Sequence, residues 1–256
     1  MLVNVYDLEG EVKESVELPK IFSTSFRPDL IRKAVSIAQS NKRQPYGSSP
    51  LAGKKHSEES WSVGRGVSRV PRLSQGRRAV LMPGSVGGRR AHPPRPDKKI
   101  KEKLNKKEAR LAKNSALAAT ADKELVLSRN HRFNQKLSLP LVVTDDFEKL
   151  SNTKRVINIF QALGIWDDVC RSKEKKHIRP GKGKLRGRKY KRAKSLLLVL
   201  SEKSFVQKAT GNLPGVDVVH PKELTVELLA PGADPGRLTL FTKSSLKKVG
   251  EPNGSS

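Results

Sequence analysis

Alternating apolar and polar residues predict a β-hairpin at the start of the chain, over residues 1–18. The segment LVNVYD alternates, a Glu-Gly pair offers a turn, and apolar spacing then resumes. Phe22 and Phe26 follow as expected core residues. From Pro28 onward apolar residues recur at helical spacing, so residues 28–40 are predicted to form an amphipathic helix that starts at a proline.

A long stretch without apolar periodicity comes next, over residues 41–97. It is dense in Gly, Pro, Ser, Arg and Lys, and it shows neither a 3.6-residue nor a 2-residue period. A structureless loop of this length within a compact domain is usually functional or disordered. Arg and Lys recur throughout it against only Glu58, Glu59 and Asp97. We therefore expect a polyanion to give this loop its structure.

The loop returns into a second predicted helix that begins at Asp97. Asp97 can cap its N-terminus, and Ile100, Leu104, Leu111 and Leu117 would form a narrow apolar stripe on a lysine-rich helix. The two helices would form a base from which the long basic loop projects.

The second half of the chain alternates between strands and helices. Continuous apolar runs predict buried strands near 141–143 and over 194–202, with shorter strands at 215–220 and 237–241. Helices are expected at 152–163, at 221–230 and after Thr242, which can cap the last one. The predicted fold is α/β: an open, mainly parallel sheet with helices on both faces.

These segments also predict the organisation of the chain into parts. A discontinuous globular domain would comprise residues 1–40 and 98–250. The extended loop would comprise residues 41–97, and residues 251–256 would be a disordered tail.

The formal net charge of +27 and the pI of about 10.4 favour a polyanionic partner. Nucleic acid is the first candidate. A membrane surface is a weak second, since the longest aliphatic run, Leu196–Leu200, is far too short to span a bilayer. A single cysteine, Cys170, excludes a disulfide framework or a thiolate metal site, and no secretory signal is evident. We expect a cytoplasmic protein.

The sequence offers little for catalysis. The segment GKGKLRG at 181–187 matches neither glycine-rich nucleotide-binding motif, so it is a flexible solvated loop or, better, a site for a nucleic-acid backbone. Asp145 and Asp146 follow a predicted strand, but a capping and turn role fits them better than chemistry because they lack a catalytic partner. Neither a cofactor nor a metal site is expected, since the five histidines have no ligand spacing. His131 and His220 read as ordinary domain residues.

The expected RNA-binding residues are the basic and aromatic side chains of two segments. In the loop they are Lys42, Arg43, Tyr46, Lys54, Lys55, His56, Trp61, Arg65, Arg69, Arg72, Arg77, Arg78, Arg89, Arg90, His92 and Arg95. In the second segment they are Lys182, Lys184, Arg186, Arg188, Lys189, Tyr190, Lys191 and Arg192. Trp61 and Tyr46 would either stack on bases or pack locally.

Several motifs in a specific order suggest a family. YDLEGEV, RPDLI, WSVGRGVSRVPR, VGGRRAHPP, SALAATAD, VVTDDFE and GKGKLRGRKYKR together resemble large-subunit ribosomal protein four in its archaeal form, over nearly the whole chain. The resemblance implies a non-catalytic ribosomal protein bound to 23S-type rRNA and neighbouring proteins, without a membrane or a second copy of itself. It also implies that the loop reaches the nascent-peptide exit tunnel. The tunnel-proximal tip would comprise Trp61, Val63, Gly64, Arg65, Gly66, Val67 and Arg69. The alternatives are an RNA-processing enzyme and a chromosomal nucleic-acid-packing protein.

Overall fold

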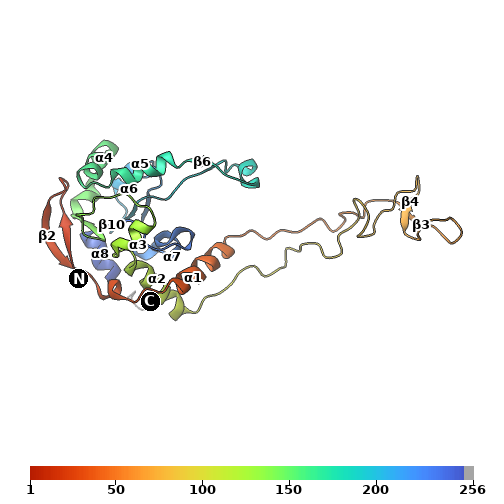
Figure 1. Cartoon of the computed structure of the whole chain (residues 1–256), viewed down its shortest axis with the longest axis horizontal. Coiled ribbons are helices and arrows are strands. Elements are labelled where there is room, and N and C mark those ends of the chain that lie inside the picture. The colour runs from red at the N-terminus through yellow and green to blue at the C-terminus, as the bar shows by residue number, and fades with distance from the viewer. Residues whose placement is uncertain (251–256) are drawn as a thin grey trace. The chain divides into compact units, whose positions relative to one another are not determined.

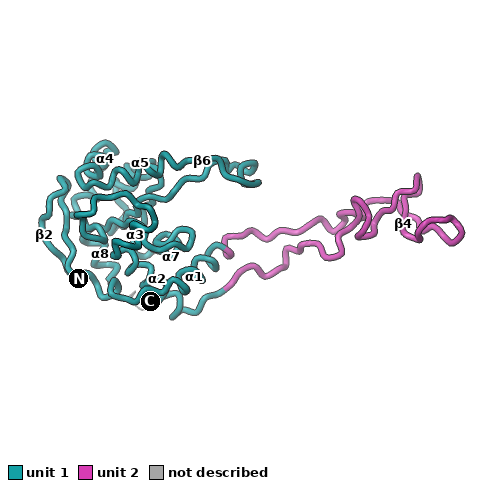
Figure 2. The backbone as a smooth tube through the Cα atoms, in the orientation of Figure 1, with its two compact units in different colours: residues 1–39, 103–256 teal, residues 40–102 magenta. Residues whose placement is uncertain are grey.

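The computed structural model describes residues 1–250, which fall into two compact units. Unit 1 comprises residues 1–39 and the chain from residue 103 onward, and unit 2 comprises residues 40–102 (Figure 2). The expected disordered tail, residues 251–256, lies outside the described residues.

Unit 1 is built on a six-stranded sheet with the order β2-β1-β5-β10-β8-β9. Only β1 and β2 pair antiparallel, as the predicted hairpin. The other four neighbouring pairs are parallel, which confirms an α/β fold with a mainly parallel sheet. The strands are β1 (Leu2–Tyr6), β2 (Val12–Glu17), β5 (Leu141–Val143), β8 (Leu197–Val199), β9 (Asp217–Val219) and β10 (Thr239–Thr242).

Helices cover both faces of this sheet (Figure 1). The α-helices are α1 (Pro28–Asn41), α2 (Lys106–Ala118), α3 (Lys123–Ser128), α4 (Thr153–Ala162), α5 (Trp166–Glu174), α6 (Phe205–Thr210), α7 (Val226–Leu229) and α8 (Lys243–Gly250). The 3₁₀ turns are η1 (Lys20–Ser23), η2 (Asp145–Lys149), η3 (Lys182–Arg186), η4 (Pro221–Glu223) and η5 (Pro231–Ala233).

Period-2 alternation along the buried strands separates two hydrophobic cores. Leu198 points into the core that contains residues of α4, α5 and α6. Leu197 and Val199 point into the opposite core, which contains residues of α1, α2, α7 and α8. All three side chains are fully buried, and burying each contributes about 1.5–3 kcal/mol. A strand that is covered on both faces explains the continuous apolar run in its sequence.

The predicted capping roles of Asp145 and Thr242 are confirmed at the start of α8, and Asp146 lies in the neighbouring turn η2. Asp145 accepts hydrogen bonds from the backbone N–H of Ser244 at 2.9 Å and from its hydroxyl at 2.6 Å, so it caps α8 from a neighbouring turn. Asp146 forms an ion pair with Lys149 at 2.7 Å. Thr242 accepts from the backbone N–H of Ser245 at 3.4 Å, as expected for the residue before this helix.

One expected core residue is exposed. Phe22 is buried and meets Phe241 edge-on, with ring centroids 6.0 Å apart. Phe26, in contrast, is 42% exposed, so its assignment to the core was wrong. It lies between η1 and α1, where the chain turns, and Ile31 of α1 takes the buried position instead.

The second helix also begins later than the sequence indicated. Asp97 does not cap it: α2 starts at Lys106, after Asn105. Leu111, assigned to the apolar stripe, is 49% exposed, and the buried face is formed by Ala112, Ser115, Ala116 and Leu117. The residues between Asp97 and Asn105 belong largely to unit 2, where their backbone finds other partners.

Candidate nucleic-acid interface

Unit 2 consists of two chain segments that run antiparallel and are tied to each other at intervals (Figure 2). At one end the Ser40 hydroxyl donates to the carbonyl of Ile100 at 3.0 Å. Asn41 both donates to the carbonyl of Glu102 at 3.1 Å and accepts from its N–H at 2.9 Å. Because Asn41 satisfies the backbone of Glu102 outside any helix, this stretch does not continue α2 as a helix.

Glycines allow the two segments to approach closely. A Cβ on Gly47 would lie 2.6 Å from Cδ of Pro96, and one on Gly53 would lie 2.5 Å from the backbone nitrogen of Arg89. Gly53 also adopts a positive φ of 73°, which favours glycine. These glycines are therefore required by the pairing of the segments within unit 2.

Unit 2 also contains a small sheet of its own. Strands β3 (Glu58–Ser60) and β4 (Pro71–Leu73) pair antiparallel, and a bridge joins Arg72 to Ala79. Val80, only 3% exposed, is buried beside them. Residues 58–73 have no apolar period, so the expectation of a loop without internal structure was wrong at this end. Backbone pairing forms these strands.

Trp61 lies beside this small sheet and between two arginines. The guanidinium carbons of Arg65 and Arg72 lie 5.0 and 5.4 Å from the centre of its ring, within cation–π range. Arg72 also donates to the carbonyl of Arg77 and, at 3.0 Å, to the hydroxyl of Ser68. Trp61 therefore packs locally in this structure, and Arg72 organises the turns around it.

Most of the other expected RNA-binding side chains of unit 2 are exposed. Only Trp61, Arg72 and Arg89 are partly buried. Tyr46 is 71% exposed, so its ring is open to a partner. The exposed set is Lys42, Arg43, Tyr46, Lys54, Lys55, His56, Arg65, Arg69, Arg77, Arg78, Arg90, His92 and Arg95. In the expected tip, Val63, Gly64, Gly66 and Val67 are exposed as well.

The second basic segment folds as a hairpin in unit 1, here called the basic hairpin, residues 175–192. Strands β6 (His177–Ile178) and β7 (Tyr190–Lys191) pair antiparallel, and η3 forms the apex between Gly181 and Gly187. Both glycines adopt positive φ, of 86° and 76°. Their sequence spacing therefore serves a backbone turn.

The basic hairpin carries ten Lys or Arg residues and no acidic residue. Its expected RNA-binding side chains are all exposed, and none forms an ion pair within residues 1–250. They are Lys182, Lys184, Arg186, Arg188, Lys189, Tyr190, Lys191 and Arg192. The ammonium groups of Lys176 and Lys189 lie 4.2 and 5.6 Å from the centre of the Tyr190 ring.

A buried polar cluster at the base of the hairpin was missed by sequence reasoning. Asp168 accepts from Arg171 Nε at 2.8 Å, from His131 Nδ1 at 3.0 Å and from the backbone N–H of Arg132 at 3.1 Å. His131 meets Asp168 and Arg171 of α5, which follow it by 37 and 40 positions, so sequence spacing offered no signal. His131 is 3% exposed, and its ring is held by the hydrogen bond to Asp168.

The ionisation of this cluster follows from burial and pairing. Burial lowers the pKa of His131, and its hydrogen bond to Asp168 only partly offsets this, so the ring is neutral near pH 7. Burial alone would raise the pKa of Asp168. Hydrogen bonds from His131 and Arg171, together with the charge of Arg171, nevertheless hold the pKa of Asp168 below its usual value. Because the carboxylate can only accept, the proton of His131 resides on Nδ1.

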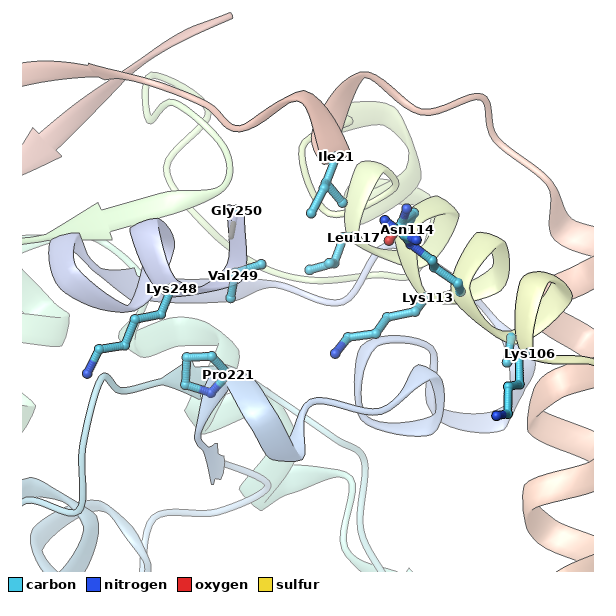
Figure 3. A pocket seen from close by; sticks show the side chains of 11 residues that line it. Ile21, Lys106, Lys113, Asn114, Leu117, Pro221, Lys248, Val249 and Gly250 are labelled. Atoms are coloured by element: carbon cyan, nitrogen blue, oxygen red, sulfur yellow. The ribbon is translucent and has the colours of Figure 1, made fainter. Parts of the chain in front are cut away.

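A third basic surface, also missed from the sequence, is a hollow of about 660 Å³ beside α2 (Figure 3). Lys106, Arg110 and Lys113 line it over a floor that includes Leu117 and Val249, and no acidic residue lines it. Burial lowers the pKa of Lys113. A phosphate group would supply the counter-charge that this partly buried lysine lacks within residues 1–250.

Other kinds of site have little support among residues 1–250. No three His, Cys, Asp or Glu side chains in this range gather in a way that could hold a metal ion. None of the described helices is long and apolar enough to cross a membrane.

Comparison with known proteins gives a consistent result. The model of the Ribosomal protein L4/L1 family matches residues 16–252. Large ribosomal subunit protein uL4 of Archaeoglobus fulgidus is 53% identical over 251 residues, which cover 98% of this chain and 99% of the relative. The uL4 protein of Methanococcoides burtonii is 53% identical, with 96% of both chains covered.

A more distant relative agrees with these two. The uL4 protein of Methanosphaera stadtmanae is 45% identical over 249 residues, which cover 97% of this chain and 96% of the relative. The resemblance suggested by the motifs is therefore confirmed over nearly the full length. This chain belongs to the Ribosomal protein L4/L1 family.

Proposed function

We propose that this protein is a structural constituent of the large ribosomal subunit and that it binds large-subunit rRNA without catalysing a reaction. The observation that carries the proposal is the presence of two arrays of exposed cations, one in unit 2 and one in the basic hairpin; those of the hairpin form no ion pair within residues 1–250. The relatives of this chain are named as large ribosomal subunit proteins, so large-subunit rRNA is the polyanion that we propose as its partner.

Unit 2 would act by presenting cations from an already paired backbone. Glycines such as Gly47 and Gly53 bring its segments together, and prolines restrict the free chain, so less entropy is lost when RNA orders it. Arginine side chains can fork onto phosphate oxygens, and the exposed Tyr46 can stack on an unpaired base.

The finer assignment concerns the end of unit 2 near the small sheet. In the proposed arrangement, residues 61–70 lie at the wall of the nascent-peptide exit tunnel, with Arg65, Gly66 and Arg69 nearest the lumen. Family membership and the exposure of these residues support this placement. The protein would thus work in the cytoplasm, within the ribosome, beside 23S-type rRNA and neighbouring ribosomal proteins.

An RNA-processing enzyme on the same fold is the weaker alternative. It would need a cluster of groups that can bind a metal or transfer protons at the carboxyl ends of the strands. Among the carboxylates found there, Asp145 caps α8 and Asp146 pairs with Lys149. Glu148 accepts hydrogen bonds from Ser201 and Thr242.

RNA binding can be tested with the full chain and three probes: a large-subunit rRNA transcript, a short RNA duplex, and a DNA duplex of the same length. We expect the order rRNA, RNA duplex, DNA duplex in affinity, with residues 42–96 protected from protease only by rRNA. Equal affinity for the two duplexes and no protection would instead favour a nucleic-acid-packing protein.

A further inference from the structure

The basic hairpin leaves α5 and returns into β8, and side chains of α5 hold the returning segment. Arg171 Nη2 donates to the carbonyl of Lys194 at 3.0 Å, and the Ser172 hydroxyl donates to the carbonyl of Ala193 at 2.6 Å. Both donors lie near the end of the helix that leads into the hairpin. The two ends of the hairpin are therefore fastened to each other.

The returning segment is also held from its other side. The backbone N–H of Ser195 donates to the carbonyl of Gly215 at 3.0 Å, and the Ser195 hydroxyl donates to that of Pro214 at 2.9 Å. A Cβ on Gly215 would lie 2.6 Å from the carbonyl oxygen of Ala193, so only glycine fits. Lys194 forms an ion pair with Asp217 at 2.8 Å.

Arg171 is itself held in place by the buried cluster. Its side chain is 6% exposed, and that of its partner Asp168 is fully buried. His131 and the backbone of Arg132 occupy further acceptor positions of Asp168. With Nε bound to Asp168, the guanidinium Nη2 lies 3.3 Å from His131 Nδ1 and donates to the carbonyl of Lys194.

A buried ion pair of this kind is a poor way to stabilise a fold. Desolvation of the two charges offsets most of their attraction, and apolar residues of similar volume often stabilise a protein equally well. α5 already contributes Val169 to the core, which is 1% exposed. The cluster is better explained by what it fixes in space.

We propose that Arg171, Asp168, His131 and Ser172, here called the staple, set the direction in which the basic hairpin leaves unit 1, so that its cations are presented to RNA in a fixed array. This inference rests on the proposed RNA-binding function of the hairpin. Figure 1 shows the hairpin extending from α5 beyond the helices that cover the sheet.

The benefit of a fixed array follows from the charge of the hairpin. Ten cations without an acidic residue repel one another, and a hairpin on a loose base would sample many directions. RNA would then have to order it on binding, which lowers affinity. Freezing the backbone freedom of about one residue corresponds to roughly a tenfold change in affinity.

The test is a mutant cycle in the full-length protein. One arm is Asp168→Leu with Arg171→Met, which removes both buried charges and leaves the net charge unchanged. The other arm replaces Lys182, Arg186, Arg188 and Arg192 by glutamine. Affinity for a large-subunit rRNA transcript is measured for the parent, each arm and the combination, and thermal unfolding is measured for all four.

We expect the staple substitutions to weaken RNA binding about tenfold when the hairpin carries its charges. The same substitutions should have little effect on RNA binding when the hairpin is neutralised. Equal losses in both backgrounds would overturn the inference, because the staple would then support the fold in general. No loss in either background would also overturn it, provided that neutralising the hairpin weakens binding. If that neutralisation has no effect, the proposed function of the hairpin fails first.

A direct measure of direction complements the cycle and does not depend on RNA. In a Cys170→Ser background, one spin label is attached at Leu185→Cys, where the native side chain at the hairpin apex is 83% exposed, and a second at Lys208→Cys on α6. The experiment measures the distribution of distances between the two labels. The staple variant should widen this distribution. Ser172→Ala, which removes one bond to Ala193, should widen it less. An unchanged width in the double variant would contradict the inference.

Discussion

Neutralising the basic hairpin should change the salt dependence of RNA binding by a calculable amount. Each phosphate that a protein cation neutralises contributes a slope of about −0.9 in log affinity against log salt for duplex, and about −0.7 for single strands. Glutamine at Lys182, Arg186, Arg188 and Arg192 removes four exposed cations that form no ion pair in the described part of the chain. If each contacts one phosphate, the slope becomes shallower by about 3 to 4, and affinity at about 0.1 M salt falls by roughly 10³-fold.

The assay is equilibrium binding of the full chain to an rRNA transcript between about 50 and 200 mM salt, the range in which counterion release dominates. A matched control carries the same change in charge at exposed lysines of unit 1 outside the hairpin. These are Lys203, Lys208, Lys222 and Lys247. We expect the control to retain nearly the parental slope. Equal slopes for both variants would refute the reasoning, since the hairpin would then act only through the net charge of the protein.

Three further predictions concern other parts of the chain. Folding lowers the pKa of His131, so the free energy of unfolding should decrease as the pH drops below about 6.5. In denaturant titrations, His131→Asn should reduce that decrease by up to about 1.4 kcal/mol per pH unit. Trp61→Leu should speed amide exchange in residues 61–72 while leaving unfolding of unit 1 unchanged; slower or equal exchange would argue against the cation–π contacts. Lys106→Gln should weaken rRNA binding more than Lys107→Gln, its neighbour on α2 that does not line the hollow, and equal effects would leave the hollow without a role.

Much of unit 1 could be predicted from the sequence because its signals are local and strong. Every residue from Leu196 to Leu200 is apolar and buried, as expected of a strand that is covered on both faces. α4 combines a capping Asn152 with Val156, Ile159 and Phe160 at helical spacing, and each of the three lies in the core. The buried strand and the helix expected from these two patterns were both confirmed.

The errors arose where local signals were overridden by partners far away in sequence. Asp97, followed by apolar residues at helical spacing, had the pattern of a helix start. In the structure Ser40 and Asn41 instead form hydrogen bonds with the backbone of Ile100 and Glu102, which lie outside any helix. No local pattern encodes that pairing across about sixty positions of chain.

The candidate nucleic-acid interface likewise has parts that the sequence predicted and parts that it did not. The exposed cations were predictable because charge runs are visible in sequence and need only solvent around them. The small sheet in unit 2 was not, since Glu58–Ser60 has no apolar alternation and pairs through its backbone. The cluster of His131, Asp168 and Arg171 was hidden as well, because the fold alone brings it together.

The most direct test of a ribosomal scaffold role is protein–RNA crosslinking in a cell lysate that is then fractionated by size. The protein should co-migrate with the large ribosomal subunit, and its crosslinks should concentrate in residues 42–96 and 175–194. A protein found free or on DNA, with crosslinks elsewhere or none at all, would contradict the proposed function.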